Sequence, residues 1–361
     1  MSTWENGVTH CEDTAAFVHD YFSRTDSKVL IIGGAGFDPR SAAVSTSIAH
    51  ATPDAVSNLC GIFIREERAN PASNLMQLAD QNIAHLRTAI PNCHFESIEI
   101  FDKVDNAVVG AKRLISWIAP RMVNIGSVTD IVLDLSALSI GVSFPLVRYV
   151  YETFGRQANG PNVHLFVAED PNLDSGIIPE HTDQPMYVPG FQGDAGLDQQ
   201  SGATRLWIPQ LVRNRREALR RIHDFVRAEE TCPILPFPAR NLRSGDELLE
   251  HFIKEIVDVW EVDPRNYIYA AEREPLDLYR TLLRLDDARR RVYQAHGGSL
   301  LVLSPIGSRA LAMGALLAAL ERNFPIAYLE SIGYALPDSP GPADLRSWPI
   351  VHIWLTGDAY A

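Results

Sequence analysis

Short apolar runs alternate with longer amphipathic stretches along this chain, and that alternation constrains the fold more than any other feature of the sequence. Runs such as Lys28–Ile32 (KVLII) and Asp130–Leu135 (DIVLDL) are mainly apolar and rich in β-branched residues, as are strands buried on both faces of a parallel sheet. Stretches with helical spacing of apolar residues, such as Asn74–Ala89, lie between the runs. The alternation predicts an α/β fold with mainly parallel sheets.

The same plan occurs twice. The first half contains the strand candidates Lys28–Ile32, Gly61–Ile64, His94–Ile100, Asp130–Leu135 and Asn162–Val167. The second half contains Arg205–Ile208, Thr231–Leu235, Asn266–Ala270, Ser299–Leu303, Ile326–Leu329 and a sixth, edge strand, Pro349–Leu355. The 361 residues also exceed the roughly 250–300 at which single cores stop growing. We therefore predict two tandem Rossmann-like domains, residues 1–200 and 201–361.

Predicted helices separate these strands in both halves. They are Asn74–Ala89, Ala107–Ile118 and Val142–Tyr151 in the first half, and Arg215–Arg227, Asp246–Trp260, Leu276–Gln294 and Ala310–Arg322 in the second. A stretch rich in Pro, Gly and Asp, Glu169–Gly202, lies between the halves. A loop of that length is uncommon inside a compact domain, so it predicts either the domain boundary or a lid over a site.

Charge and composition exclude several classes of function. The net charge is −13; residues 1–200 hold 12 Lys+Arg against 24 Asp+Glu, and residues 201–361 hold 20 against 21. This balance argues against binding duplex nucleic acid, which needs a basic face. The four cysteines are scattered and the eleven histidines form no ligand pair, so we expect no metal site and no other cofactor. With no signal peptide and no apolar run long enough for a membrane span, we expect a cytoplasmic protein without membrane contact.

Ligands of open α/β sheets bind beyond the carboxyl ends of the strands, and the loop after Lys28–Ile32 is rich in glycine there. Its residues Gly33, Gly34, Gly36, Asp38 and Arg40 are candidates for binding a phosphate, because glycine lets the backbone approach an anion. The alternative is a tight strand-to-helix turn without a ligand. The loop departs from the similar Gly-Gly-x-Phe-Asp-Pro-x-His signature of adenylyltransferases by one extra residue and by Arg40 in the approach to the histidine.

The loops after the fourth strand of each half combine hydroxyl groups with a following helix. In the first half these are Ser136 and Ser139; in the second half they are Ser304, Gly307, Ser308 and Arg309. Small polar residues and a cation at a helix N-terminus suit a phosphate or a nucleotide.

The second of these loops resembles the strand–loop–helix motif of CRISPR-associated Rossmann-fold domains. That motif reads as an apolar strand, then Thr/Ser-Gly-Gly-Thr/Ser-Lys, then a helix of small residues; Arg309 stands where lysine is usual. Leu135–Ser139 resembles it more faintly and has no cation. The resemblance covers the element order of both halves and is specific in one short motif. These domains and the related SAVED domains sense cyclic oligonucleotides in prokaryotic antiviral defence, so the resemblance implies a nucleotide sensor that acts through a partner effector.

Further arginines follow the second and third strands of the second half. Arg240 and Arg243 follow Thr231–Leu235, and Glu272 and Arg273 follow Asn266–Ala270. In a parallel sheet these positions converge on one edge, where arginine reads phosphate through paired hydrogen bonds. Surface salt bridges are the alternative for each arginine taken alone.

The sequence has no Gly-x-Ser-x-Gly elbow, no Walker loop and no dinucleotide fingerprint. We therefore favour a non-catalytic sensor of a small nucleotide that works with a protein partner or as a homo-oligomer. Two alternatives stay open. One is an enzyme acting on a nucleotide or phosphosugar, with Asp38, Ser136 or Glu272 in acid–base or nucleophilic roles. The other is a structural subunit of a multi-protein defence complex.

Overall fold

The computed structural model describes residues 2–123, 125–126, 128–155, 157, 160–193, 202–336 and 348–360. The chain divides into two compact units. The larger unit contains residues 7–180 and 332–361, and the smaller unit contains residues 1–6 and 181–331. Each unit is built from two separate stretches of chain, a division that differs from the predicted one. The predicted boundary, at residues 200 and 201, lies outside the described residues.

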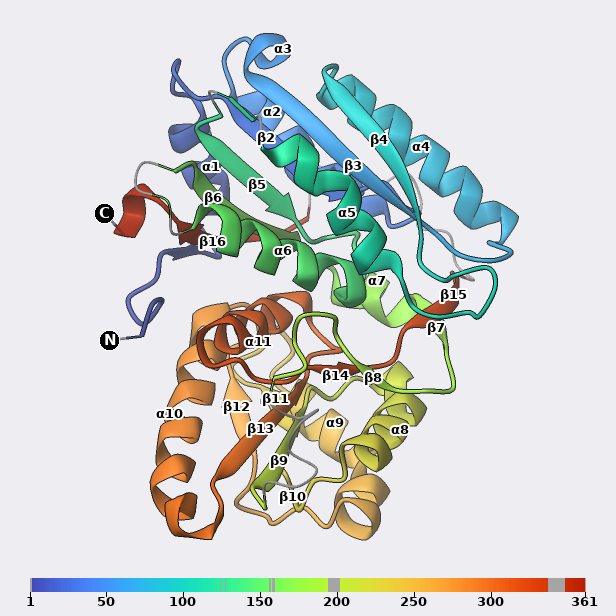
Figure 1. Cartoon of the computed structure of the whole chain (residues 1–361), viewed down its shortest axis with the longest axis vertical. Coiled ribbons are helices and arrows are strands. Elements are labelled where there is room, and N and C mark those ends of the chain that lie inside the picture. Colours follow the sequence, from blue (N-terminus) through green and yellow to red (C-terminus); the bar gives the residue numbers. More distant parts are fainter. Residues whose placement is uncertain are drawn as a thin grey trace. The chain divides into compact units, whose positions relative to one another are not determined.

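The larger unit is built on a seven-stranded sheet (Figure 1). Its five parallel strands are β2 (Val29–Gly34), β3 (Leu59–Glu67), β4 (Cys93–Glu99), β5 (Asp130–Asp134) and β6 (Asn162–Ala168). Two antiparallel strands, β16 (Ile350–Thr356) and β1 (Thr9–His10), complete the order β1-β16-β6-β5-β2-β3-β4. The predicted mainly parallel, Rossmann-like α/β sheet is confirmed here, and the strand order reverses between β2 and β5.

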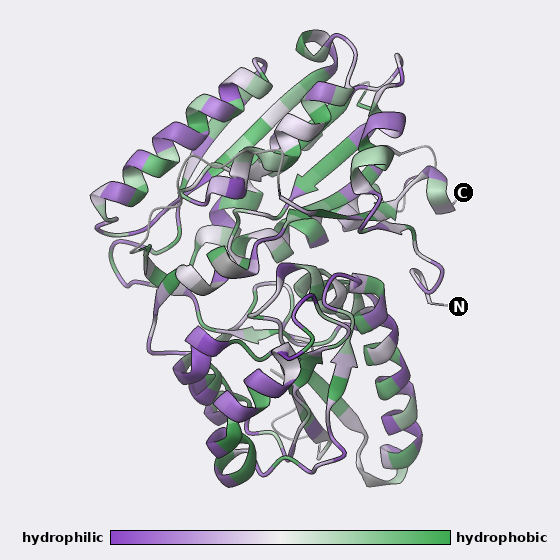
Figure 2. Cartoon of the chain, turned by 180° about the vertical axis from the view of Figure 1, so that it is seen from behind, coloured by the Kyte–Doolittle hydropathy of each residue, from purple (hydrophilic) through white to green (hydrophobic). Residues whose placement is uncertain are grey.

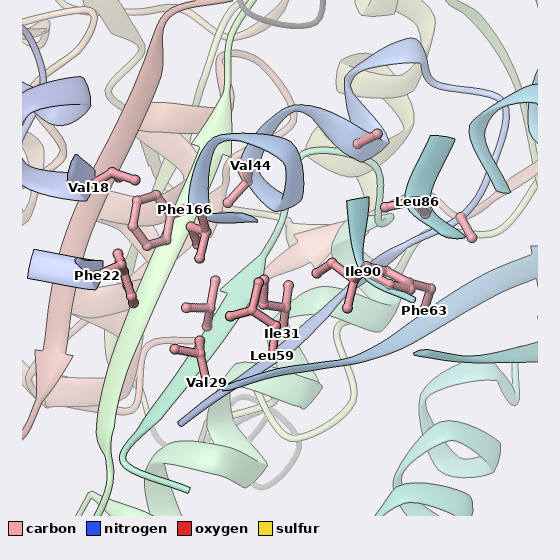
Figure 3. Close-up of a cluster of buried hydrophobic side chains, with 14 residues drawn as sticks. Val18, Phe22, Val29, Ile31, Val44, Leu59, Phe63, Leu86, Ile90 and Phe166 are labelled. Carbon is pink, nitrogen blue, oxygen red and sulfur yellow. The ribbon is translucent and has the colours of Figure 1, made fainter. Parts of the chain in front are cut away.

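Helices cover both faces of this sheet. They are α1 (Thr14–Phe22), α2 (Ala43–Ala51), α3 (Ala55–Asn58), α4 (Ser73–Ala89), α5 (Gly110–Met122), α6 (Ile140–Phe154) and α7 (Pro171–Gly176). Figure 3 shows the core on the side of α1, α2 and α4, where Phe22, Val44 and Leu86 pack against Ile31 of β2 and Phe166 of β6. Burial of such side chains supplies most of the favourable free energy of folding.

The smaller unit repeats the strand order with shorter strands. They are β9 (Thr204–Pro209), β10 (Glu230–Thr231), β11 (Ile234–Pro236), β12 (Ile268–Ala270), β13 (Ser299–Ser304) and β14 (Ala327–Tyr328). Parallel pairs and single parallel bridges join them in the order β12-β11-β9-β13-β14, with β10 beside β9. An antiparallel strand, β8 (Met186–Tyr187), pairs with β14. The strand order thus reverses between β9 and β13.

The helices of the smaller unit are α8 (Arg216–Val226), α9 (Ser244–His251), α10 (Pro275–Tyr293) and α11 (Arg309–Arg322). The helix predicted over Asp246–Trp260 is divided, because α9 ends at His251 and a π-helical turn spans Glu255–Val259. In Figure 2 the strands are mostly hydrophobic, whereas the outer helices alternate hydrophobic and hydrophilic turns. No helix among the described residues combines the length and apolar character that crossing a membrane requires.

The two units exchange their antiparallel strands. Strand β8 follows β6 of the larger unit along the chain but pairs with β14 of the smaller one, whereas β16 follows β14 but pairs with β6. The two chain crossings, β7 (Ile178–His181) and β15 (Ser331–Ala335), pair with each other. The prediction of Pro349–Leu355 as an edge strand of the second half is therefore wrong: this segment lies inside the larger unit's sheet, between β6 and β1.

The stretch Glu169–Gly202 was predicted as one long loop, but it contains regular structure. Helix α7 and strands β7 and β8 lie within it, and residues 194–201 lie outside the described residues. The apolar side chains of Leu173, Ile177 and Val188 in this stretch are buried. Its proline and glycine residues separate short elements from one another.

Candidate functional site

The first candidate region is the carboxyl edge of the larger unit's sheet, where β2 and β5 are neighbours and the strand order reverses. Such a reversal normally opens a crevice for a ligand. Here the end of β2 packs directly against the end of β5 and the loop after it. A Cβ atom on Gly34 would lie 2.7 Å from the backbone oxygen of Ala137, and one on Gly33 would lie 3.1 Å from Cβ of Asp134. These two glycines thus allow the end of β2 to approach β5 and its loop closely.

Asp38 and Arg40, from the same loop, form a buried ion pair. The Arg40 side chain is fully buried; its Nε donates to Oδ1 of Asp38 at 3.0 Å and its Nη2 donates to Oδ2 at 2.7 Å. Nη2 also donates to Oδ1 of Asp174 in α7 at 2.8 Å. Burial alone would lower the pKa of Arg40, but the carboxylates of Asp38 and Asp174 raise it above its ordinary value.

Asn82 also binds the loop that holds this pair, whereas the buried Nη1 of Arg40 has no hydrogen-bond partner among the described residues. The Asn82 side chain in α4 donates to the backbone oxygens of Gly36 and Asp38 at 2.8 and 2.9 Å. Gly36 itself has open space where a Cβ atom would lie. The predicted residues Asp38 and Arg40 are therefore brought together, and they bind each other and α7.

Ser136 and Ser139, after β5, also have internal partners. The Ser136 hydroxyl donates to Oδ1 of Asp134 at 2.5 Å and accepts from the backbone N–H of Ala168 at 2.8 Å. Ser139 precedes α6, and its backbone N–H donates to Oε1 of Glu66 at 2.7 Å. The Glu66 carboxylate thus lies at the helix N-terminus, the position that suits a phosphate.

Arg68 completes this arrangement. Its Nη1 lies 2.8 Å from Oε2 of Glu66, and both side chains are more than nine-tenths buried. The Arg68 guanidinium also lies over the ring of Tyr334, 5.0 Å from its centroid. Glu66, Arg68 and Asp174 are not among the residues predicted from the sequence. The available signal was that Glu66 and Arg68 lie two and four residues after the apolar run Gly61–Ile64.

In the smaller unit, the strand order reverses between β9 and β13, and the side chain of Gln210 fills this position. Its Nε2 donates to the backbone oxygen of Ser308 at 3.2 Å, and its Oε1 accepts from the backbone N–H of Gly307 at 3.3 Å. A Cβ atom on Gly307 would lie 2.8 Å from Gln210 side-chain atoms. Gln210 is also not among the predicted residues, although it is the polar residue that directly follows the strand.

The predicted residues after β13 have mixed surroundings. The Ser304 hydroxyl is buried and accepts from Nε1 of Trp207 at 2.9 Å. The Ser308 hydroxyl caps α11 by accepting from the backbone N–H of Leu311 at 3.5 Å. Gly307, Ser308 and Arg309 remain half-buried at the start of that helix. Of this group, Ser304 has a clear structural role, and the other three lie closer to solvent.

The loops after β11 and β12 are joined to each other by backbone hydrogen bonds. The Phe237 N–H donates to the Ala270 oxygen at 2.7 Å, and the Glu272 N–H donates to the Pro238 oxygen at 2.9 Å. Oε2 of Glu272 accepts from the backbone N–H of Arg240 at 2.9 Å. Glu272 thus holds the Arg240 backbone in place, and the Arg240 guanidinium takes no part in this hydrogen bond.

These loops carry an exposed surface that we call the aromatic–arginine surface, consisting of Phe237, Arg240, Leu242, Arg243 and Tyr269. The rings of Phe237 and Tyr269 lie edge to face, 6.3 Å apart, and are 57% and 56% exposed. Arg240 and Arg243 are exposed. In the part of the chain that the structure describes, neither guanidinium has a hydrogen bond or an ion pair. Arg273, half-buried, follows Glu272 on the neighbouring loop.

An open groove of about 670 Å³ lies elsewhere, along the edge strand β4 and helix α5 of the larger unit. It contains none of the predicted site residues. Its lining includes four carboxylates against two cations, and Arg113 already pairs with Glu99 and Asp102 at 3.2 and 3.0 Å. The groove is therefore unsuited to an anionic ligand. Among the described residues, no group of three His, Cys, Asp or Glu side chains is placed to hold a metal ion.

No protein-family model matches this chain, and no curated protein gives a significant match to it. The resemblance to CRISPR-associated Rossmann-fold domains thus stays a prediction. The geometry nevertheless separates the predicted residues into two groups. Those of the larger unit are mostly buried and bound to one another, whereas the guanidinium groups of Arg240 and Arg243 lie at the surface and contact no partner within the described ranges.

Proposed function

We propose that this protein binds a small nucleotide, such as a cyclic oligonucleotide, at the carboxyl edge of the smaller unit's sheet. The observation that carries the proposal is the aromatic–arginine surface. Exposed guanidinium groups suit phosphates, and exposed aromatic rings suit stacking of bases. Because neither guanidinium has a partner among the described residues, neither must break a hydrogen bond within the protein to contact a ligand.

The loops of this edge are spaced for a ligand of nucleotide size. The loop after β11 and the loop after β13 lie on either side of β9, so strand spacing places them about 10 Å apart. The N-terminus of α11, with Ser308 and Arg309, lies on the β13 side. We infer that a phosphate bound there and a base on Phe237 and Tyr269 belong to one ligand.

We further propose that the protein is a sensor of bacterial defence in the cytoplasm and acts through a partner effector. The carboxyl and hydroxyl groups considered for catalysis favour this over an enzyme. Asp38 and Ser136 are buried and hydrogen bonded, and Glu272 accepts a backbone hydrogen bond that orders a loop. A side chain held in this way supports binding geometry and is poorly placed to exchange protons with a substrate.

Calorimetry against a panel of cyclic and linear oligoadenylates tests the proposal. We expect binding at micromolar concentration or better, and a loss of at least about 100-fold in affinity for the double variant Arg240→Ala/Arg243→Ala, because hydrogen bonds to charged groups contribute about 1.5–3 kcal/mol each. Arg265→Ala is the matched control. This arginine is exposed as well, but it precedes β12 and so lies toward the opposite end of the strand.

Two results would contradict the proposal. One is the absence of binding by the wild-type protein to every oligoadenylate at micromolar concentration. The other is equal affinity of the wild-type protein and the double variant. A comparable loss in the Arg265→Ala control would indicate non-specific attraction of anions, and it would equally count against a site at this edge.

A further inference from the structure

Three buried side chains lie in line across adjacent strands of the larger unit: Asp130 of β5, His164 of β6 and His352 of β16. Nε2 of His164 lies 3.3 Å from Oδ1 of Asp130, and Nδ1 of His164 lies 3.0 Å from Nε2 of His352. All three residues are completely buried. We call these three residues the relay. It connects β16, which follows the smaller unit along the chain, to the parallel strands β6 and β5.

Hydrogen-bond chemistry determines the protonation of the relay. An ionised carboxylate only accepts, so His164 donates its Nε2 proton to Asp130. Its Nδ1 is then an acceptor, and His352 donates to it from Nε2. The remaining nitrogen of His352, Nδ1, consequently carries a lone pair. Among the described residues it has no hydrogen-bond partner.

The surroundings offer no charge to stabilise a proton at that nitrogen. The His352 ring is stacked on Phe17, with centroids 4.3 Å apart, and lies 4.5 Å from the ring of Phe166 and 5.4 Å from that of His10. The titratable and charged groups around the relay are His10, Asp13, Tyr21, Arg24, Asp130, His164 and Asp358, and the Asp13 carboxylate pairs with His10 at 3.0 Å. Asp130 is shared among Tyr21, Thr129 and His164, so it does not serve His352.

We propose that this relay is a proton-sensitive latch, which holds β16 in the larger unit's sheet near neutral pH and releases it on acidification. A proton on Nδ1 would make His352 a buried cation, and burying a charge without a partner costs a large amount of free energy. When β16 separates from the sheet, water reaches this nitrogen and the ring is free to accept the proton.

The direction of the pH effect follows from the pKa values. Burial lowers the pKa of His164, and burial together with the neighbouring His164 and His10 lowers the pKa of His352 well below its ordinary value of 6.5. A histidine with a depressed pKa in the closed sheet takes up a proton on opening. The stabilising effect of the relay is therefore complete above about pH 6.5 and is lost as the pH falls below that value.

Hydrogen exchange measured by mass spectrometry on the whole protein tests the latch. Between about pH 7.5 and pH 5.5, after correction for the intrinsic exchange rate, one such histidine raises the opening constant about tenfold. We expect this rise in peptides covering β16, while peptides of β2 stay protected. In His352→Gln the side chain still donates a hydrogen bond but does not titrate, so the rise should be about tenfold smaller than in the wild-type protein.

His19→Gln is the matched control, since His19 lies on the neighbouring helix α1 with its side chain 77% exposed, and this variant should keep the tenfold rise. A purely structural relay would instead give His352→Gln weaker protection of β16 at both pH values with the pH effect retained. That result would overturn the latch. If His352→Gln does not fold, the wild-type protein decides: equal loss of protection in β16 and β2 would equally reject it.

Discussion

The tripeptide Asp-Pro-Arg occurs in both units, as Asp38–Arg40 and as Asp263–Arg265, and it folds into the same ion pair each time. The distance from arginine Nε to aspartate Oδ1 is 3.0 Å in the larger unit and 2.9 Å in the smaller one, and Nη2 to Oδ2 measures 2.7 and 2.8 Å. The surroundings differ completely, because the Arg40 side chain is fully buried and that of Arg265 is 88% exposed. The local sequence therefore determines that the ion pair forms. The elements that bury it determine how much it contributes to the free energy of unfolding.

The same contrast extends to the two sheet edges. Both units have a reversal of strand order with glycines and hydroxyl groups beside it. In the larger unit Asp38, Asp174 and Glu66 already bind the cations and the helix N-terminus that a ligand would use. In the smaller unit Arg240 and Arg243 remain at the surface. Equivalent topology thus gives one edge stabilised by its own carboxylates and one suited to an external anion.

The largest effect should separate the two Asp-Pro-Arg pairs. Asp38→Asn leaves the buried Arg40 with a single carboxylate, Asp174, and we expect a loss of about 3–5 kcal/mol in the free energy of unfolding. Asp263→Asn breaks a pair at the surface, with the Arg265 side chain 88% exposed, and should leave the unfolding midpoint nearly unchanged. Urea denaturation of both variants measures the difference. Equal midpoints would show that burial does not distinguish the pairs.

Alanine substitution of the glycines beside the two reversals of strand order tests which atoms occupy the space next to each glycine. Gly34→Ala places a Cβ atom against the backbone of Ala137, which cannot turn away, so we expect a loss of about 1–3 kcal/mol in stability. Gly36→Ala, two residues along, meets open space and should be tolerated. Thermal unfolding followed by circular dichroism compares the two. A tolerated Gly34→Ala would mean that the end of β2 and the loop after β5 are not in contact.

The smaller unit provides the counterpart of that test. The three atoms nearest to a Cβ added at Gly307 all belong to the side chain of Gln210, so the second substitution Gln210→Ala should recover much of the stability that Gly307→Ala loses. No such partner substitution exists for Gly34, because its neighbour is backbone. If Gln210→Ala fails to recover stability, side-chain crowding is not the cause.

The last comparison concerns the carboxylate at the N-terminus of α6. Glu66→Gln removes the charge that pairs with the buried Arg68 and favours the helix dipole, and we expect a loss of about 3 kcal/mol in urea denaturation. Glu67, the half-buried neighbour, pairs with Arg65 near the surface, so Glu67→Gln should have the smallest effect, below about 1 kcal/mol. A gain of oligoadenylate affinity in Glu66→Gln would move the ligand site to the larger unit and reverse the comparison.

Much of the fold could be predicted from the sequence, because strands and helices are determined locally. The runs Lys28–Ile32, Asp130–Leu135 and Ser299–Leu303 coincide with strands β2, β5 and β13 to within a few residues. The sheet to which Pro349–Leu355 belongs could not be predicted, since strand pairing is a long-range choice that periodicity does not encode. The short strands β7 and β8 could not be predicted either, because they lie in a proline-rich stretch and pair with strands far away in the sequence.

The position of the polar residues at the sheet edges could be predicted from the sequence. Whether each of them already binds another part of the protein could not. Glycines and hydroxyl groups after Lys28–Ile32 and Ser299–Leu303 do lie at the carboxyl edges of parallel strands. Whether a polar residue there is free or engaged depends on partners far away in sequence, as with Asp174, 134 residues from Arg40. A single sequence contains no signal for such a pair.

The exchange of antiparallel strands has a consequence for synthesis of the chain. During translation β6 is complete long before β16, which emerges only after the whole smaller unit. Until then β6, buried along its entire length in the finished protein, has an unpaired apolar edge. Such edges recruit other strands and promote aggregation. The smaller unit has no such interval, because β8 is already synthesised when β14 appears and can pair with it at once. The sheet of the larger unit, in contrast, cannot be completed until the last strand of the chain has been synthesised.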